Sequence, residues 1–353
     1  MAKNKQQRLD PNKVEKVEVP ARLEPSARIP QEARSTGPTP PGRGRNGKSG
    51  RPGGRPPSAP KIKKAGARDW IAGARLRTLP LSIAPVILGT AAAHVTLQPW
   101  LWLNASLALA VAVLLQIGVN YANDYSDGVR GTDKYRLGPS RLTGSGAARP
   151  RTVLTVALTF FVLAAAAGVG LTVITGQYWL LAVGAACIVA GYFYTGGKRP
   201  YGYYGLGELF VFIFFGLVAT AGTTYVQLKT VNFESWLSGV AVGLIACAVL
   251  MVNNIRDRPQ DKLAGKRTLA VLIGDRASRV VFAVFMLLPY VLVIYFVITQ
   301  ANGYLTYFAL LLTAPSVLIA LTAKTPKELI LALQLASLSA LAFSLILGFA
   351  MVV

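Results

Sequence analysis

The sequence predicts an all-α membrane protein in which nine helices cross the bilayer. The chain of 353 residues is 53% hydrophobic and 15% charged, whereas soluble chains are about 25% charged. A bilayer-crossing helix needs about 20 consecutive, mostly apolar residues. Nine stretches meet this requirement, and they lie at about 79–97, 103–122, 152–174, 178–195, 205–226, 236–255, 279–299, 303–322 and 328–351.

The connections between these stretches predict how the chain is oriented. Of the 20 Lys and Arg in residues 69–353, 19 precede the first stretch or follow the second, fourth, sixth and eighth, and only Lys229 lies on the other side. Excess Lys and Arg mark the cytoplasmic side of a membrane protein. We therefore expect a cytoplasmic N-terminus, an outside C-terminus and long cytoplasmic loops.

Residues 1–68 differ in composition and are predicted to form a disordered, basic, Pro- and Gly-rich tail. They hold 17 Lys and Arg against five Asp and Glu, and 11 of the 21 prolines. Such a segment buries too little apolar surface to offset its ordering entropy. A solvated extension and a basic arm held against anionic lipid headgroups both stay open. The lack of interleaved aromatic residues argues against a nucleic-acid partner.

The acidic residues of the membrane domain, residues 69–353, are few and clustered. Five of its ten Asp and Glu lie in NDYSDGVRGTD and NNIRDRPQD, at the cytoplasmic ends of the second and sixth stretches. Both segments contain Asn-x-x-x-Asp, as Asn123 with Asp127 and Asn253 with Asp257. A spacing of four places both side chains on one helical face. The repeated pattern suggests two related four-helix units that face each other.

Carboxylates gathered at a membrane edge need cations. Oxygen ligands of this kind suit Mg²⁺, which binds one or two carboxylates together with substrate phosphates. Basic residues follow both clusters, and they are Arg130, Arg136, Arg141, Lys266 and Arg267. Such residues suit a phosphate ester, to which arginine gives bidentate contacts. An alternative is that the charges only anchor helix ends. That reading suits the basic residues but not the acids, because acids contribute little to topology.

A third loop on the same side, YFYTGGKRPYGYYGLGE, combines a lysine with several tyrosines. Tyr194 and Lys198 are four residues apart, and Lys198 is placed to reach a diphosphate. The tyrosines can flank an aromatic substrate or stabilise a cation through their ring faces. The alternative is that they belong to an interfacial aromatic belt.

These motifs resemble those of the UbiA superfamily of intramembrane prenyltransferases, and the resemblance covers about residues 69–353. It implies nine transmembrane helices and two aspartate-rich cytoplasmic motifs that bind Mg²⁺ and a prenyl diphosphate. The implied metal ligands are Asn123, Asp127, Asp133, Asn253, Asp257 and Asp261. Tyr194 and Lys198 match the family's Tyr-x-x-x-Lys, and Asp124 lies off the helical face of the first motif.

Longer stretches of sequence indicate one branch within this superfamily. GARLRTLPLSIAPVILGT, NDYSDGVRGTDKYRLGPSRLTGSGAA and NNIRDRPQDKLAGKRTLAVLIG are similar to the 1,4-dihydroxy-2-naphthoate polyprenyltransferases of menaquinone synthesis. The spacing of six between Asp127 and Asp133 agrees with this branch. The implied reaction transfers a polyprenyl group from polyprenyl diphosphate to 1,4-dihydroxy-2-naphthoate, with loss of CO₂ and diphosphate, and gives demethylmenaquinol. The implied location is the bacterial cell membrane, with the active site facing the cytoplasm.

The resemblance also implies roles for individual residues. The catalytic residues would be Asp127, Asp257, Lys198 and Tyr194. The diphosphate would be bound by Lys198, Arg136, Arg141, Lys266 and Arg267. The prenyl chain length, the residues that bind the naphthoate ring and the presence of a homodimer stay open.

Two kinds of alternative are weighed against this reading. A related enzyme would use another acceptor, such as 4-hydroxybenzoate, haem, a chlorophyllide or a phosphoribosyl donor. A multi-pass transporter would place its ionisable groups near the bilayer midplane. Here the acids lie at the ends of the predicted spans, which favours the enzyme.

Overall fold

The structure is a computed structural model that describes residues 64–96, 100–135 and 141–353, and all regular structure in these ranges is helical. The α-helices are α1 (Ala67–Gly73), α2 (Pro80–Thr96), α3 (Trp102–Arg130), α4 (Pro150–Thr175), α5 (Leu180–Phe193), α6 (Gly207–Val211), α7 (Ala219–Leu228), α8 (Phe233–Leu263), α9 (Leu269–Ile273), α10 (Asp275–Thr299), α11 (Leu310–Thr322) and α12 (Pro326–Val352). The 3₁₀-helices are η1 (Leu76–Thr78), η2 (Thr132–Tyr135), η3 (Tyr201–Tyr203) and η5 (Gly303–Ala309), and η4 (Phe212–Val218) is a π-helix.

Two predictions fall on residues that the structure does not describe. Residues 1–63 of the expected tail and Arg136 lie outside the described ranges, so the disorder and the diphosphate contact predicted there stay predictions. Residues 64–68, also assigned to the tail, lead into helix, because α1 begins at Ala67. The amide of Ala65 donates to the carbonyl of Ala147 at 2.9 Å.

The predicted spans agree with the described helices at seven positions. Seven segments of the described chain are long and apolar enough to cross a membrane, and they are α3, α4, Gly207–Leu228, α8, α10, Gly303–Thr322 and α12. The first predicted span, 79–97, corresponds to α2, Pro80–Thr96, which passes the test for a span only together with Ala67–Thr78, from which it is bent by 46°. The fourth is α5, which has only 14 residues. In the described ranges, seven helical segments, or eight with the bent pair, are long and apolar enough to cross a membrane, where nine spans were predicted.

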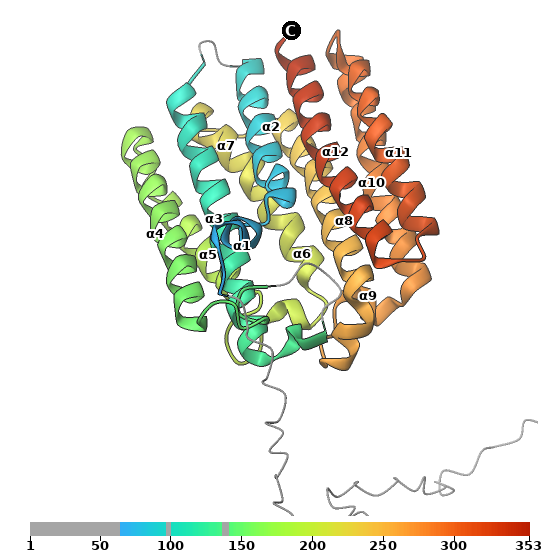
Figure 1. Cartoon of the computed structure of the whole chain (residues 1–353). Coiled ribbons are helices and arrows are strands. Elements are labelled where there is room, and N and C mark those ends of the chain that lie inside the picture. Colours follow the sequence, from blue (N-terminus) through green and yellow to red (C-terminus); the bar gives the residue numbers. More distant parts are fainter. Residues whose placement is uncertain (1–63, 97–99, 136–140) are drawn as a thin grey trace, which may run out of the picture. The chain divides into compact units, whose positions relative to one another are not determined.

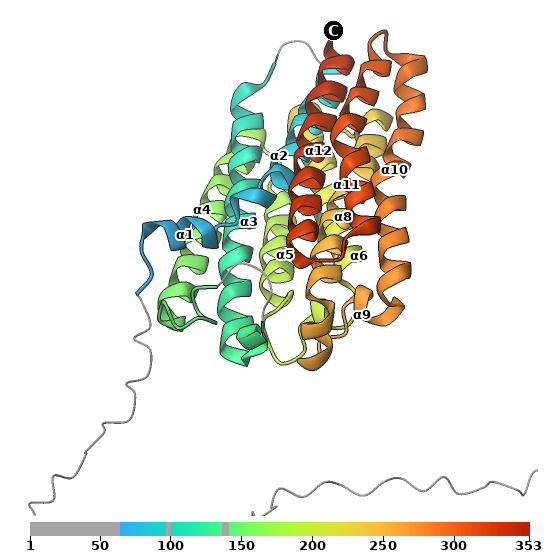
Figure 2. The same ribbon diagram turned by 45° about the vertical axis from the view of Figure 1, so that its right-hand side comes forward.

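Helix α8 is the central element of the helical bundle. In its most apolar window 72% of the residues are buried, and the helix contacts α2, α10 and α12 (Figures 1 and 2). The side chains of Leu88, Met251, Phe282 and Phe343 fill the core between these helices and are completely buried. On the other side, α3 and α4 pack against each other.

Glycines allow the π-helix to lie against α8 at backbone distance. A Cβ atom on Gly216 would lie 2.6 Å from the Cα atom of Gly243 and 2.7 Å from the carbonyl oxygen of Gly239. In lipid no hydrophobic force drives helices together, so helices associate through van der Waals contacts, and close approach of this kind strengthens those contacts. The π-helix is thereby fixed to the central helix.

The helices that carry the two aspartate clusters end on the same side of the bundle. Helices α3 and α8 both run toward the end opposite the C-terminus of α12, and the loop between α5 and α6 lies there as well (Figure 1). Helix α3 continues to Arg130 and α8 to Leu263, beyond the apolar spans predicted for them. Both Asn-x-x-x-Asp pairs are therefore helical, as their spacing requires.

Candidate active site

A cavity of about 510 Å³ lies among α2, α3, α4, α5, the π-helix, α7 and α8. Apolar side chains form most of its wall, whereas its charged residues are Arg75, before η1, and residues from the ends of α3 and α8 and the loops that follow them. Eight of the predicted site residues line it, and they are Asn123, Asp127, Arg141, Tyr194, Asn253, Asp257, Asp261 and Lys266. The two clusters, distant in sequence, thus share one cavity.

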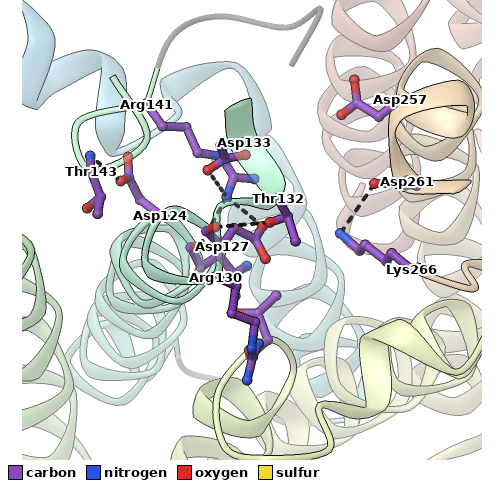
Figure 3. Close-up of polar contacts among 12 residues, drawn as sticks. Asp124, Asp127, Arg130, Thr132, Asp133, Arg141, Thr143, Asp257, Asp261 and Lys266 are labelled. Atoms are coloured by element: carbon purple, nitrogen blue, oxygen red, sulfur yellow. Dashed lines mark hydrogen bonds and ion pairs between the residues drawn. The ribbon is translucent and has the colours of Figure 1, made fainter. Parts of the chain in front are cut away.

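Arg141 is the centre of the first cluster (Figure 3). Its Nη1 donates to Asp127 Oδ2 at 2.6 Å and to the carbonyl of Asn123 at 3.0 Å, and it lies 3.3 Å from Asp133 Oδ2. Burial opposes the charged form of Arg141, but Asp127, Asp133 and Asp124 raise the pKa of the guanidinium above its ordinary value. One permanently charged nitrogen therefore joins two carboxylates.

Hydrogen bonds from backbone amides hold the segment that contains Arg141 against the end of α3. Gly131 ends α3 in the left-handed conformation, at φ 74°, which glycine adopts without a Cβ clash. Asp124 then accepts hydrogen bonds from the backbone amides of Leu142, at 2.9 Å, and Thr143, at 2.8 Å. Asp124 therefore anchors the loop that carries Arg141.

The second cluster occupies the last turns of α8 and the loop that follows. The helix continues through Pro259, so Asp261 lies one turn beyond Asp257 on the same helical face. Asp257 accepts two hydrogen bonds from Arg256, at 2.8 and 2.6 Å. The Nζ atom of Lys266 lies 3.9 Å from Asp261 Oδ1. Figure 3 shows this cluster opposite the first.

Tyr203 connects the two clusters, although the sequence did not single it out. Its hydroxyl donates to Asp127 Oδ1 at 2.7 Å, and Lys266 Nζ lies 5.0 Å from the centre of its ring. Burial, and then the charge of Asp127, raise the pKa of the Tyr203 phenol above its ordinary value, so the hydroxyl keeps its proton at neutral pH. The density of tyrosines in the loop was the only sequence signal, and it does not tell which ring faces α3.

Three predicted diphosphate contacts are not brought to the cavity by the described geometry. Lys198 and Arg267 are exposed and do not line it, and Arg136 lies outside the described residues. Arg130 holds the loop ahead of Lys198, because its guanidinium donates to the carbonyls of Thr195 and Gly197. The sequence also passed over Arg75, which lines the cavity.

The oxygen atoms of the site fit a hard divalent cation. Among the described residues, no three His, Cys, Asp or Glu side chains are grouped closely enough to hold a metal ion by themselves. Asp127 and Asp133, however, both reach the same nitrogen of Arg141, so their oxygens converge on one positively charged point. Mg²⁺ needs only one or two carboxylates when waters and substrate phosphates complete its shell.

The fold and the site together define a class of protein. It is a helical membrane protein in which two aspartate clusters share a largely apolar cavity. Residues 82–330 match the UbiA prenyltransferase family, and the chain belongs to that family. The resemblance inferred from the motifs is confirmed.

Curated relatives agree with this assignment, and a solved structure has a similar fold. The chain is 54% identical over 214 residues to a 1,4-dihydroxy-2-naphthoate octaprenyltransferase of Mycobacterium tuberculosis, covering 61% of this chain and 73% of the relative. It is 34% identical over 270 residues to a protein of the same name from Haemophilus influenzae, covering 74% and 88%. A UbiA homolog from Archaeoglobus fulgidus bound to DMAPP and Mg²⁺ has a similar fold, with a TM-score of 0.54 over 80% of this chain and 99% of that chain at 16% identity.

Proposed function

We propose that the chain transfers a polyprenyl group from polyprenyl diphosphate to 1,4-dihydroxy-2-naphthoate, releasing CO₂ and diphosphate and forming demethylmenaquinol. The observation that carries the proposal is the shared cavity, with two aspartate clusters at one end and an apolar wall suited to an isoprenoid chain. The names of the relatives from M. tuberculosis and H. influenzae support this acceptor. The distribution of Lys and Arg supports nine spans, a cytoplasmic N-terminus and a site that faces the cytoplasm of a bacterial cell.

Oxygen atoms from both clusters would hold Mg²⁺. The residues are Asn123, Asp127 and Asp133 on α3 and η2, and Asn253, Asp257 and Asp261 on α8. When bound, Mg²⁺ neutralises the diphosphate and stabilises the charge of the leaving group. The hydroxyl of Thr195 donates to Asn123 Oδ1 at 2.6 Å, which fixes this amide and leaves a second lone pair for a ligand.

Arg141 and Lys266 are the chain's own donors for the diphosphate. Both line the cavity, and each contacts an aspartate that would share the anion's metal. A guanidinium contacts phosphate oxygens in a bidentate manner, and an ammonium acts as a point charge. Tyr203 keeps Asp127 oriented through its hydrogen bond while these donors turn to the substrate.

The reaction needs no covalent enzyme intermediate. The ring carbon that bears the carboxylate bonds to the allylic carbon as the allylic C–O bond breaks, and diphosphate leaves with the electron pair. The bond from the ring to the carboxylate then breaks, CO₂ departs, and the electron pair restores aromaticity. Tyr194, Tyr201 and Phe210 line the cavity with successive ring centroids 5.5 and 4.0 Å apart. Their faces would stabilise the developing allylic cation.

A membrane assay with a prenyl diphosphate and 1,4-dihydroxy-2-naphthoate, with and without Mg²⁺, tests the proposal by product mass. We expect a Mg²⁺-dependent product whose mass equals naphthoate plus prenyl minus CO₂. If a product forms only with 4-hydroxybenzoate or another aromatic acceptor, the proposed acceptor is wrong and prenyl transfer still stands. Failure to form a prenylated product with any acceptor, in membranes that contain the protein, would refute prenyl transfer.

A further inference from the structure

Glu208 is a buried carboxylate that the proposed reaction leaves without a role. It is the second residue of α6, and only 5% of its surface is exposed. Its Oε1 accepts a hydrogen bond from Asn254 Nδ2 at 3.0 Å, and the thiol of Cys247 donates to its backbone carbonyl at 3.1 Å. No hydrogen-bond donor among the described residues reaches its Oε2. A carboxylate is costly to bury with so few partners, so its position calls for a function.

The bond to Glu208 fixes how the amide of Asn254 is turned. The Nδ2 atom of Asn254 donates to Glu208 Oε1, so the NH₂ group of the amide faces the carboxyl group. The carbonyl oxygen of Asn254 is then directed away from Glu208. Asn254 lines the cavity, whereas Glu208 does not. The pair therefore has a carboxylate behind the wall and an amide in the wall, with the amide oxygen left for a ligand.

We infer that Glu208 is a positioning residue that holds Asn254 with its Oδ1 toward the cavity, where this oxygen accepts a hydrogen bond from a hydroxyl group of the aromatic acceptor. The inference rests on the proposed function. A diphosphate carries only acceptors and is served by the donors Arg141 and Lys266, whereas an aromatic diol offers O–H donors. As the ring attacks, positive charge develops on the hydroxyl-bearing carbon, and the hydroxyl becomes a stronger donor to Oδ1.

The surroundings of Asn254 suit a flat aromatic ring. A Cβ atom on Gly207, next to Glu208, would lie 3.4 Å from the hydroxyl oxygen of Tyr194, so the Tyr194 ring lies beside the start of α6. Tyr201 and Phe210 are stacked at 4.0 Å with an interplanar angle of 23°, and both line the same cavity as Asn254. These aromatic rings and the amide of Asn254 therefore line one cavity.

Kinetics in membranes separate this role from metal binding and from stability. The measured quantities are KM for 1,4-dihydroxy-2-naphthoate, KM for the prenyl diphosphate and the Mg²⁺ concentration for half-maximal rate. We expect Glu208→Leu and Asn254→Leu each to raise KM for the naphthoate about tenfold, the effect of one lost hydrogen bond. The other two quantities should stay within about twofold. Glu208→Gln should retain most of the wild-type affinity, because its amide oxygen accepts the same hydrogen bond.

The double variant Glu208→Leu/Asn254→Leu gives a further readout. If Glu208 acts through Asn254, the double variant is no worse than Asn254→Leu alone, because groups that act as one unit are not additive. Gln227→Leu is the matched control: it removes a buried amide that bonds to Thr90 and does not line the cavity. It should leave both KM values unchanged.

Several results would overturn the inference while the proposed function stands. With an active wild type, the inference is wrong if Asn254→Leu leaves KM for the naphthoate unchanged. It is also wrong if Asn254→Leu or Glu208→Leu raises the Mg²⁺ concentration for half-maximal rate, or raises both KM values equally. If the Glu208→Leu protein does not insert into the membrane, the other two variants test the inference. Asn254→Leu changes only the side chain at the cavity wall, and Glu208→Gln keeps the hydrogen bond to Asn254. A wild-type protein that forms no prenylated product contradicts the proposed function itself.

Discussion

Replacing Tyr203 with Phe tests how the loop between α5 and α6 serves the aspartates. The substitution deletes one hydroxyl and keeps the ring that Arg130 and Lys266 contact at 5.3 and 5.0 Å. The lost hydrogen bond is 2.7 Å long and ends on Asp127, which is 3% exposed. Hydrogen bonds to charged groups contribute about 1.5–3 kcal/mol. Because Tyr203 itself is only half-buried, the lower part of this range applies, about 1.5–2 kcal/mol.

This free energy corresponds to a loss of about 10- to 30-fold in kcat/KM for the prenyl diphosphate. The assay is initial-rate kinetics in membranes, normalised to the amount of inserted protein. Tyr204→Phe is the matched control, since Tyr204 is the next residue and is 55% exposed; its kcat/KM should stay within twofold of the wild type. Equal kcat/KM values for Tyr203→Phe, Tyr204→Phe and the wild type would refute the view that the Tyr203 hydroxyl orients Asp127.

Three other predictions follow from the site and the cavity. Asp127→Ala or Asp257→Ala should abolish turnover in properly inserted protein, and full activity in both would contradict the metal–diphosphate site. Asp124→Ala should lower turnover less than Asp127→Ala does. It should reduce the free energy of unfolding by about 1–3 kcal/mol, because two buried backbone amides lose their acceptor. An unchanged free energy of unfolding would argue against the anchoring role of Asp124. Gly222 lines the cavity with no atom within 4 Å of an added Cβ, so Gly222→Phe should disfavour octaprenyl over geranyl diphosphate by about 5- to 100-fold. Gly170→Phe, equally free of contacts but outside the cavity, is its control and should leave the chain-length preference unchanged.

Hydropathy and charge predicted the positions of most helices well, because the length and apolar character of a membrane-spanning helix are set by the bilayer more than by neighbouring helices. A span must be apolar over about 20 residues wherever it packs, so α3, α4, α8, α10 and α12 were all found. The same averaging misses breaks. The 46° bend before α2 and the 14-residue length of α5 are properties of the backbone path, which a hydropathy window does not contain.

The aspartates were predictable and most of their partners were not. An Asn-x-x-x-Asp pair has a fixed geometry on a helix, so Asp127 and Asp257 could be placed by spacing alone. The path of a loop depends instead on tertiary hydrogen bonds. Lys198 was predicted at the site, but its side chain is exposed, and the carbonyls of Thr195 and Gly197 before it bond to Arg130. Tyr203, predicted nowhere, reaches Asp127 through the same loop.

The loop between α5 and α6 sets the relation between the two aspartate clusters. Thr195 bonds to Asn123 and Tyr203 to Asp127, both on α3. The carbonyl of Tyr203 accepts from the amide of Arg267, in the segment that follows α8, at 3.0 Å. Helix α3 packs chiefly on α4, whereas α8 packs chiefly on α10, α12 and the π-helix, and both also contact α2 and α7. A change in this loop should therefore alter how the two clusters share one diphosphate before it alters the stability of the bundle.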